Sequence, residues 1–302
     1  MTATYPAALT GPVPGTGLAD LAGLPGTGLA DRPVSRTPRP RSYLMCRPAH
    51  FTVRYAINPW MASGETVDTA RAIRQWQGLL DAYTSLGHAV RFIDGHPDLP
   101  DMVFAANGAT VIGGTVLGAR FRYPERAAEG PAYLDWFRRR GYRAVHEPRR
   151  VNEGEGDIVP AGPVILAGHG FRTEAGVRDE LEALFGLPVI SLRLVDPRFY
   201  HLDTALCVLD GHTAAYYPAA FDTAGRVALA GHFAELIEAS DEDAGVLGLN
   251  AVSDGRHVIL PAQATGLAAD LAARGFEPVP VDMSEFRKAG GGPKCCTLEL
   301  RP

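Results

Sequence analysis

The chain has 302 residues, of which 46% are hydrophobic and 21% charged, so it can bury a large apolar core as one large domain or as two. Its net charge of −5 argues against a nucleic-acid-binding surface, and no run of basic residues changes that; no apolar stretch approaches the roughly 20 residues of a membrane span. The N-terminus lacks the charged-then-apolar order of a secretory signal, and the four cysteines suggest no disulfide framework, so we expect a cytoplasmic protein.

The N-terminal residues 1–41 differ in composition from the rest of the chain. The heptapeptide Pro-Gly-Thr-Gly-Leu-Ala-Asp occurs at 14–20 and again at 25–31, and the segment is dense in Gly, Pro, Thr and Ala. It holds too little bulky apolar surface to offset the entropy of ordering, which predicts a disordered arm. A glycine-rich phosphate loop is the alternative, but the Lys-Ser/Thr ending and a preceding strand are both missing.

From Tyr43 onward, short apolar runs alternate with amphipathic helices. The helix pattern is clear where Ile73, Trp76, Leu80 and Tyr83 recur at three-to-four spacing. Helices are predicted over about 67–86, 131–140, 174–185, 223–237 and 265–273. Strands are predicted over 43–46, 90–93, 103–106, 110–112, 164–167, 189–194, 206–209, 213–217, 257–260 and 297–300. With about two strands for each helix, an α/β chain of repeated ββαβ units is favoured over a doubly wound parallel sheet.

The C-terminal stretch places two of the four cysteines, Cys295 and Cys296, directly behind a Gly-Gly-Gly-Pro-Lys run that begins at Gly290. Glycine permits positive φ and a close approach of the backbone to a ligand, and the Thr-Leu-Glu-Leu tail that follows can anchor the loop as a strand. Adjacent cysteines would bridge each other only with strain, so both thiols are expected to be free. A thiol held in such a loop suggests a nucleophile.

A second motif, Phe199-Tyr-His-Leu-Asp-Thr204, places His201 and Asp203 on one face if the segment is extended. A histidine beside a carboxylate can hold a defined tautomer and move protons. The alternative is a histidine at a strand end next to a solvated aspartate, and the motif alone does not decide between the two.

A third motif, Asn152-Glu-Gly-Glu-Gly-Asp157, packs Glu153, Glu155 and Asp157 into five residues separated by glycine. On its own, this pattern is more typical of a solvated loop. A calcium loop fits poorly, because the pattern is shorter than that of an EF-hand and lacks a distal glutamate at the right offset.

Together, a cysteine, a histidine and a cluster of acids supply what attack on a cationic carbon requires. The thiolate is the nucleophile, His201 protonates a departing amine and then activates water, and the carboxylates hold the positive substrate. Zinc is the competing use of these residue types. Neither a CxxC nor an HxxxH spacing occurs in the chain, so no metal site and no cofactor are expected.

These motifs, in this order, resemble those of the guanidine-modifying enzymes of the amidinotransferase, or pentein, superfamily. The resemblance runs from about Tyr43 to the C-terminus and is closest to the actinobacterial proteins named dimethylargininases and to the cyanobacterial arginine dihydrolases. It rests on Glu153-Gly-Glu-Gly-Asp157, Gly170-Phe-Arg-Thr173, Phe199 to Thr204 and Gly290-Gly-Gly-Pro-Lys-Cys295, together with Met45 to His50, Tyr55 to Met61 and Pro100 to Gly108. It implies a fivefold pseudosymmetric α/β propeller of ββαβ units, formed by residues 42–302 as a single catalytic domain, with the active site in its central channel.

Carried over position by position, the resemblance implies the roles of three chemical residues. Cys295 matches the nucleophile, because it directly follows the glycine and lysine stretch, whereas Cys296 takes the place of a variable neighbour. His201 matches the general acid and base, and Glu153 matches the carboxylate that binds the guanidinium.

The resemblance also implies a substrate-binding set. Arg126 and Arg172 would clamp the α-carboxylate of an amino-acid substrate by forked hydrogen bonds. The remaining members would contact the guanidino group or line the channel: Asn58, Asn107, Asp157 and Asp203 by polar contacts and Phe104 by its ring. Without the resemblance, the arginines would be assigned to surface salt bridges, the asparagines to turns and Phe104 to the core.

The implied reaction is hydrolysis at the guanidino carbon of a small molecule, with arginine or dimethylarginine as substrate. Arginine deiminases and well-studied dimethylargininases carry Asp where this chain has Asn107, and arginine dihydrolases carry Asn. Compared with an aspartate, the Asn107 amide removes one negative charge from the guanidinium site and adds a hydrogen-bond donor. The site could therefore also accept the neutral ureido product and hydrolyse it to ornithine, carbon dioxide and ammonia. Both substrates stay open, as do an amidinotransferase and a catalytically silent binding scaffold. The sequence is silent on oligomeric state.

Overall fold

The strands of this computed structural model, which describes residues 36–61 and 66–302, form five sheets of three strands each. In order of neighbouring strands, the sheets are β15 (Leu298–Glu299), β1 (Ser42–Cys46) and β2 (Ala89–Ile93); β3 (Ala109–Ile112), β4 (Thr115–Gly118) and β5 (Val145–His146); β6 (Ile158–Ala161), β7 (Val164–His169) and β8 (Val189–Arg193); β11 (Glu235–Glu238), β10 (Thr213–Tyr216) and β9 (Leu206–Val208); and β12 (Val252–Ser253), β13 (His257–Pro261) and β14 (Glu277–Val281). In each sheet, one neighbouring pair is antiparallel and the other is parallel.

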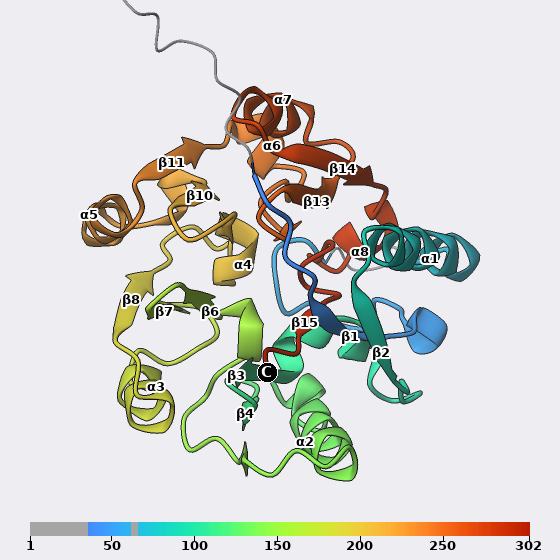
Figure 1. Cartoon of the computed structure of the whole chain (residues 1–302). Helices are drawn as coiled ribbons and strands as arrows, with labels where there is room; N and C mark the ends of the chain where they lie inside the picture. Colours follow the sequence, from blue (N-terminus) through green and yellow to red (C-terminus); the bar gives the residue numbers. More distant parts are fainter. Residues whose placement is uncertain (1–35, 62–65) are drawn as a thin grey trace, which may run out of the picture. The chain divides into compact units, whose positions relative to one another are not determined.

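Longer helices connect the parallel strands of each sheet: α1 (Thr69–Ser85), α2 (Glu129–Arg139), α3 (Val177–Phe185), α5 (Thr223–His232) and α7 (Thr265–Ala273). Parallel strands need such a crossover, because both run in the same direction. Figure 1 shows these helices on the outside of the sheets. The order strand, strand, helix, strand occurs in four consecutive segments, which confirms the α/β class. Within the described residues, no helix combines the length and apolar composition needed to cross a bilayer.

The fifth sheet joins the two ends of the described chain. Tyr43 and Leu44 on β1 pair with Glu299 and Leu298 on β15, and β1 is followed by α1 and β2. The C-terminal strand thus completes a sheet that begins at the other end of the sequence. Because Cys295 lies three residues before β15, this pairing anchors the loop that carries it.

Short helical turns form many of the remaining connections: α4 (Leu202–Ala205), α6 (Asp241–Ala244), α8 (Ser284–Arg287), and the 3-10 turns η1 (Pro48–His50), η2 (Pro100–Val103), η3 (Ala105–Gly108), η4 (Pro124–Arg126), η5 (Gly154–Gly156) and η6 (Pro218–Ala220). Residues of the motifs lie on them, since Asn107 belongs to η3, Glu155 to η5 and Asp203 to α4. The motif residues are therefore held by tight buried turns rather than by strands.

One predicted helix extends too far, and one predicted strand is wrong. The helix predicted over 223–237 ends at His232, where the backbone of Phe233 becomes extended, and β11 follows. The strand predicted over 103–106 is instead the junction of η2 and η3, in which the Phe104 N–H donates to the Asp101 carbonyl at 2.9 Å. An apolar run marks burial, and here the buried backbone satisfies its donors locally rather than in a sheet.

The buried face of α1 is shifted from the predicted one. Trp76 and Tyr83 are buried as expected, together with Ala72 and Leu79, whereas Ile73 is 47% exposed. Positions 72, 76, 79 and 83 follow the three-to-four spacing of one helix face, so Ile73 lies on the neighbouring, solvated side.

The expected arm at 1–41 falls mostly on residues 1–35, which lie outside the described residues. The remaining residues 36–41 run along the domain without helix or strand. The Arg39 N–H donates to the Asp254 carbonyl at 2.9 Å, and the Arg36 guanidinium lies 3.4 Å from the centre of the Phe276 ring. This part of the expected arm therefore contacts the sheets.

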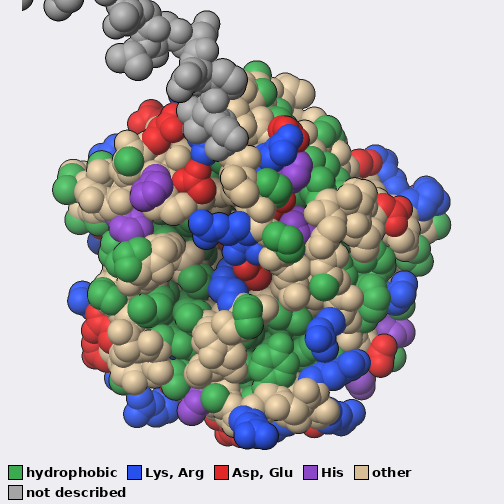
Figure 2. Space-filling model, viewed as in Figure 1, with side chains coloured by type: hydrophobic (Ala, Val, Ile, Leu, Met, Phe, Trp, Pro, Cys, Tyr) green, Lys and Arg blue, Asp and Glu red, His purple; other side chains and the backbone are tan. Residues whose placement is uncertain are grey.

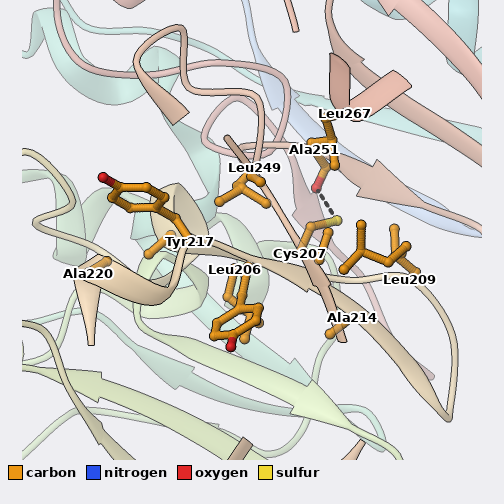
Figure 3. Packing of buried hydrophobic residues seen from close by; sticks show 14 of the residues in the cluster. Leu206, Cys207, Leu209, Ala214, Tyr217, Ala220, Leu249, Ala251 and Leu267 are labelled. Carbon is orange, nitrogen blue, oxygen red and sulfur yellow. Dashed lines mark hydrogen bonds between the residues drawn. The ribbon is translucent and has the colours of Figure 1, made fainter. Parts of the chain in front are cut away.

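Apolar clusters fill the space between the sheets. Figure 3 shows part of one, in which Leu206 and Cys207 of β9 pack with Leu249 and Ala251, and the Cys207 thiol donates to the Ala251 carbonyl at 3.4 Å. A second cluster contains Cys295 and Cys296 beside the aromatic residues Phe51, Phe104 and Phe286. The loop around residue 250 and the C-terminal cysteines are thus both fixed by packed surroundings.

Candidate active site

Cys295 lies at the end of the glycine run, with its side chain 2% exposed. The thiol donates to Asp203 Oδ2 at 3.3 Å, and Sγ accepts a hydrogen bond from Asn250 Nδ2 at 3.1 Å. A Cβ on Gly291 would lie 2.3 Å from the Phe104 ring. The absence of a side chain at Gly291 therefore lets the loop pass against that ring and bring Cys295 to Asp203.

The two adjacent thiols have different surroundings. Burial raises the pKa of the Cys295 thiol well above its usual value, and the Asp203 carboxylate and the Cys296 thiol raise it further. Burial likewise raises the pKa of Cys296, but its thiol makes no hydrogen bond with any residue of the described ranges. Of the pair, Cys295 is the thiol that faces polar side chains.

Asp203 follows His201 on a turn of helix rather than on extended backbone. The backbone is extended at His201, but α4 starts directly after it and its first turn contains Asp203, so the two residues do not lie on one extended segment. Burial raises the pKa of Asp203 to about 7, against the lowering effect of the Lys294 ammonium and the hydrogen bonds from Cys295 and Asn250. Asp203 is therefore partly protonated near neutral pH and can exchange a proton with its neighbours.

Asp203 also borders a cavity of about 520 Å³. The wall of this cavity includes Arg41, Lys294, Glu299 and Arg301. Figure 2 shows Lys and Arg side chains near the middle of the viewed face, with acidic side chains among them. The charged side chains that line the cavity are largely paired, since Arg41 and Arg301 bond to Glu299 and Lys294 bonds to Glu155.

His201, Glu153 and Arg172 form a buried ion-paired group. His201 Nε2 lies 2.8 Å from Glu153 Oε2, and Arg172 Nη1 donates to the same oxygen at 2.7 Å. The Arg172 guanidinium lies between the rings of Tyr123 and Tyr200, at 4.7 and 4.6 Å from their centres. All three side chains are nearly inaccessible, so the interaction between the Arg172 and Glu153 charges is little screened by water.

Glu153 is the fixed anion of this group. Burial alone would raise its pKa, but the charge of Arg172 and the hydrogen bond with His201 outweigh burial and hold the pKa of Glu153 below its usual value. The backbone N–H of Arg122 also donates to Glu153 Oε1 at 3.2 Å. Glu153 is therefore ionised and able to hold a cation in a site that excludes water.

Asp157 lies behind the histidine and fixes the backbone around it. Its Oδ1 accepts the Leu202 N–H at 3.0 Å, and its Oδ2 accepts the Thr173 N–H at 3.3 Å. Burial raises the pKa of Asp157 to about 6, against the lowering effect of His201. Each carboxylate oxygen of Asp157 thus accepts a backbone hydrogen bond, one from the residue after Arg172 and one from the residue after His201.

Arg126 is held by its own set of acceptors. Its Nε and Nη2 donate to Glu129 at 3.0 and 2.7 Å, and its Nη1 donates to Asn107 Oδ1 at 2.9 Å. Asn107 in turn donates from Nδ2 to the Glu153 carbonyl at 3.4 Å, so this set touches the ion-paired group. Burial raises the pKa of Glu129 to about 7, although the Arg126 charge and hydrogen bonds lower it.

Asn58 and Phe104 border the glycine run from two directions. Asn58 Nδ2 donates to the Ala289 carbonyl at 3.1 Å, one residue before Gly290. Phe104 makes an edge-on contact with Phe51, with ring centres 5.6 Å apart, and packs against Gly291. Both residues therefore adjoin the backbone that carries the thiol.

The ten residues expected from the sequence thus lie in one connected region. Two contributors were missed: Asn250, which bonds to Cys295, and Glu129, which bonds to Arg126. Glu129 had a sequence signal, because it lies three residues after Arg126, whereas Asn250 stands in a loop without any motif. Among the described residues, no group of His, Cys, Asp and Glu is arranged to hold a metal ion.

Comparison with known proteins agrees with the resemblance seen in the motifs. A family model described as N,N dimethylarginine dimethylhydrolase, eukaryotic, matches residues 47–302. The N(G),N(G)-dimethylarginine dimethylaminohydrolase of Mycobacterium tuberculosis is 54% identical over 270 residues, which cover 89% of each chain. The bifunctional arginine dihydrolase/ornithine cyclodeaminase AgrE of a Nostoc species is 37% identical over 265 residues, which cover 85% of this chain and 37% of AgrE.

Solved structures show the same α/β fold. The N-terminal domain of ArgZ, an arginine dihydrolase from cyanobacteria, was crystallised as a mutant bound to substrate; it is 35% identical with a TM-score of 0.83, covering 86% of this chain and 98% of that one. DDAH from Pseudomonas aeruginosa, complexed with citrulline, has a TM-score of 0.73 at 22% identity, covering 86% and 98%, and supports the fold alone. The family match and the 54% identity together show that this chain belongs to the dimethylarginine dimethylaminohydrolase family.

Proposed function

We propose that the protein is a hydrolase that attacks the guanidino carbon of dimethylarginine through a covalent adduct on Cys295 and releases citrulline and dimethylamine. The observation that carries the proposal is the position of the Cys295 thiol against Asp203, which stands two residues after His201, the side chain that contacts Glu153. The 54% identity to the mycobacterial enzyme supports dimethylarginine as the substrate.

In the first half of the proposed reaction, the Cys295 thiolate attacks the guanidino carbon. The C–S bond forms, the carbon becomes tetrahedral, and the bond to the dimethylamino nitrogen breaks as His201 gives that nitrogen a proton. The product of this step is an amidino group attached to sulfur. The second half uses one water, from which His201 takes a proton; the hydroxide adds to the same carbon and the C–S bond breaks to leave citrulline.

The charges around the site support binding of a guanidinium. A guanidinium remains protonated in water, so a site that excludes solvent must supply fixed anions. Glu153 is held ionised, and Asp203 adjoins the thiol. A guanidinium whose nitrogens bond to these two carboxylates would have its carbon next to the Cys295 sulfur. Because Arg172 already bonds to Glu153 Oε2, an incoming guanidinium would take over that oxygen and free Arg172 for the substrate carboxylate.

Arg126 would be the second member of the carboxylate clamp. Its Nε and Nη2 are occupied by Glu129, so a substrate carboxylate would compete with Asn107 for Nη1. Asn58, Asn107 and Asp157 would complete the polar wall, and Phe104 the apolar one. These assignments rest on the family motifs and on the contacts of each side chain.

An arginine dihydrolase is the second candidate, and Asn107 is the observation that favours it. Its amide donates to the Glu153 carbonyl and accepts from Arg126, so it contributes no charge beside the guanidinium site. A site with one anion fewer tolerates a neutral ureido group better, and citrulline could then undergo a second hydrolysis to ornithine, carbon dioxide and ammonia.

Incubation with dimethylarginine and, separately, with arginine decides between these candidates. Dimethylamine and citrulline from dimethylarginine support the first, and ornithine with two ammonia molecules from arginine supports the second. A requirement for an added acceptor amine would identify an amidinotransferase, and the absence of turnover with both substrates would refute a guanidine hydrolase.

We further propose that the five sheets are the blades of a fivefold pseudosymmetric propeller, with residues 42–302 as a single catalytic domain behind an N-terminal arm. The repeated strand, strand, helix, strand order supports this, as does the sheet formed by the two ends of the described chain. A cytoplasmic location is proposed from the cysteines, since all four are free thiols.

A further inference from the structure

We propose that Asn250 is a positioning residue that holds the Cys295 sulfur beside Asp203 and favours its thiolate form. This inference rests on the proposed function, in which that sulfur is the nucleophile. Asn250 belongs to none of the sequence motifs, and its side chain is fully buried.

The Asn250 amide uses all of its hydrogen-bonding groups within the site. Nδ2 donates to Cys295 Sγ at 3.1 Å and to the Asp203 carbonyl at 3.0 Å, and Oδ1 accepts the Cys295 N–H at 3.0 Å. The reverse orientation would set the amide oxygen against the Asp203 carbonyl and Nδ2 against a backbone N–H. The network therefore fixes which end of the amide faces the sulfur.

These three bonds tie two distant segments together. Cys295 lies on the C-terminal loop and Asp203 on α4, 92 positions apart in sequence. A single amide that bonds to both sets the distance between the thiol and the carboxyl group. A backbone hydrogen bond also joins the C-terminal loop to the Asn250 loop, because the Lys294 N–H donates to the Asn250 carbonyl at 3.2 Å.

The loop that carries Asn250 is itself rigid. Leu249 and Ala251, on either side, pack into the apolar cluster of Figure 3. Leu247 adopts a φ of 60°, a strained conformation for a leucine, and its carbonyl accepts the Asn250 N–H at 2.9 Å. A Cβ on Gly292 would lie 2.9 Å from Asn250 Oδ1, so the glycine run leaves room for this amide.

The sulfur needs such a donor because its other surroundings disfavour the thiolate. Burial, the Asp203 carboxylate and the Cys296 thiol all raise the pKa of Cys295. The backbone N–H of Gly292 acts in the opposite direction. The Asn250 amide also acts against the rise, because a hydrogen bond to an anion is stronger than one to a neutral group.

Two substitutions test the inference. Asn250→Ala removes the whole amide, and Asn250→Asp keeps an acceptor for the Cys295 N–H while it exchanges the donor at the sulfur for an oxygen. We expect the pKa of Cys295 to rise by about one unit in Asn250→Ala, and turnover at neutral pH to fall about tenfold with partial recovery at higher pH. KM should change little, because Asn250 is not expected to touch substrate. Ser253→Ala is the matched control, since Ser253 lies in the adjacent strand β12 and bonds to the Leu209 carbonyl.

The readout is the pH dependence of Cys295 alkylation by iodoacetamide, with the modified cysteine identified by peptide mass. This measurement does not depend on turnover, so it separates the inference from the proposed function. A midpoint that rises in Asn250→Ala and stays unchanged in Ser253→Ala supports the inference. Asn250→Asp should raise the midpoint further, because it also adds a negative charge beside the sulfur, so an unchanged midpoint in this variant counts against the inference even if Asn250→Ala fails to fold. An unchanged midpoint in a folded Asn250 variant overturns it, whatever happens to turnover. Full turnover of Cys295→Ser would instead overturn the proposed nucleophile.

Discussion

The substitution Asp203→Asn tests the electrostatic account of the thiol most sharply. The Asp203 carboxylate lies 3.3 Å from Cys295 Sγ and raises the pKa of that thiol. Replacing the carboxylate by an amide of nearly the same shape removes this charge and keeps the packing. The substitution should therefore lower the pKa of Cys295, even though it should also reduce substrate binding.

The size of the shift follows from Coulomb's law. Two unit charges separated by 3.3 Å interact by about 5 kcal/mol at an effective dielectric constant of about 20, which corresponds to roughly 3.5 pKa units. Because the pKa of Asp203 is raised to about 7, the carboxyl group carries only part of its charge near neutral pH, which reduces the expected shift to about two units.

The assay is alkylation of Cys295 across the pH range in the wild type and in Asp203→Asn. Cys46 serves as an internal control in the same digest, because burial raises the pKa of its thiol to about 12 and the nearby charges that act on it are those of Glu129 and Asp94. The account expects faster alkylation of Cys295 at neutral pH in the variant and no change at Cys46. A midpoint for Cys295 that stays the same or rises in a folded variant would refute the reasoning.

Three further predictions concern specificity, the glycine run and stability. In Asn107→Asp, an anion replaces the amide beside Arg126, so we expect less conversion of arginine to ornithine and more citrulline, measured by product analysis; unchanged product ratios would contradict this role. Gly291→Ala should destabilise the fold by about 1–3 kcal/mol and slow turnover, because its Cβ would clash with Phe104, and Phe104→Leu should partly restore both. The pKa values of Asp203 and Glu129 are both raised to about 7, so the folded state binds protons more tightly than the unfolded state. Their contribution to stability is present at low pH and lost as pH rises through 7. Thermal unfolding should thus occur at a higher temperature near pH 5 than near pH 8, with a weaker dependence in Glu129→Gln; the opposite trend would count against these shifts.

Much of the fold could be predicted from local pattern, and the exceptions have different causes. The helices followed from the three-to-four spacing of apolar residues and from glycines at their ends. β5 and β12 contain only two residues each, too few for a period of two to be seen. Strand β4 was missed although Gly113 and Gly114 before it both have positive φ, the signature of a tight hairpin.

The reactive residues of the site could be predicted where they stand in short sequence motifs. Cys295, His201 and Glu153 stand in short segments of unusual composition, and the order of these segments carried the family resemblance. The partner of each group was not predictable, because contacts such as Arg172 with Glu153, or Asn250 with Cys295, join residues through the fold. A lone asparagine in a loop has no local pattern that distinguishes it from a turn residue.

The most direct test of the central claim is a mass measurement of the reaction intermediate. The protein is mixed with dimethylarginine, quenched in acid during turnover, digested and analysed for modified cysteines, with Cys296→Ser as the matched variant. The account predicts an added amidino-bearing substrate fragment on Cys295 in both proteins, lost in Cys295→Ser together with turnover. Turnover that persists in Cys295→Ser, or a fragment found on Cys296 instead, would contradict it.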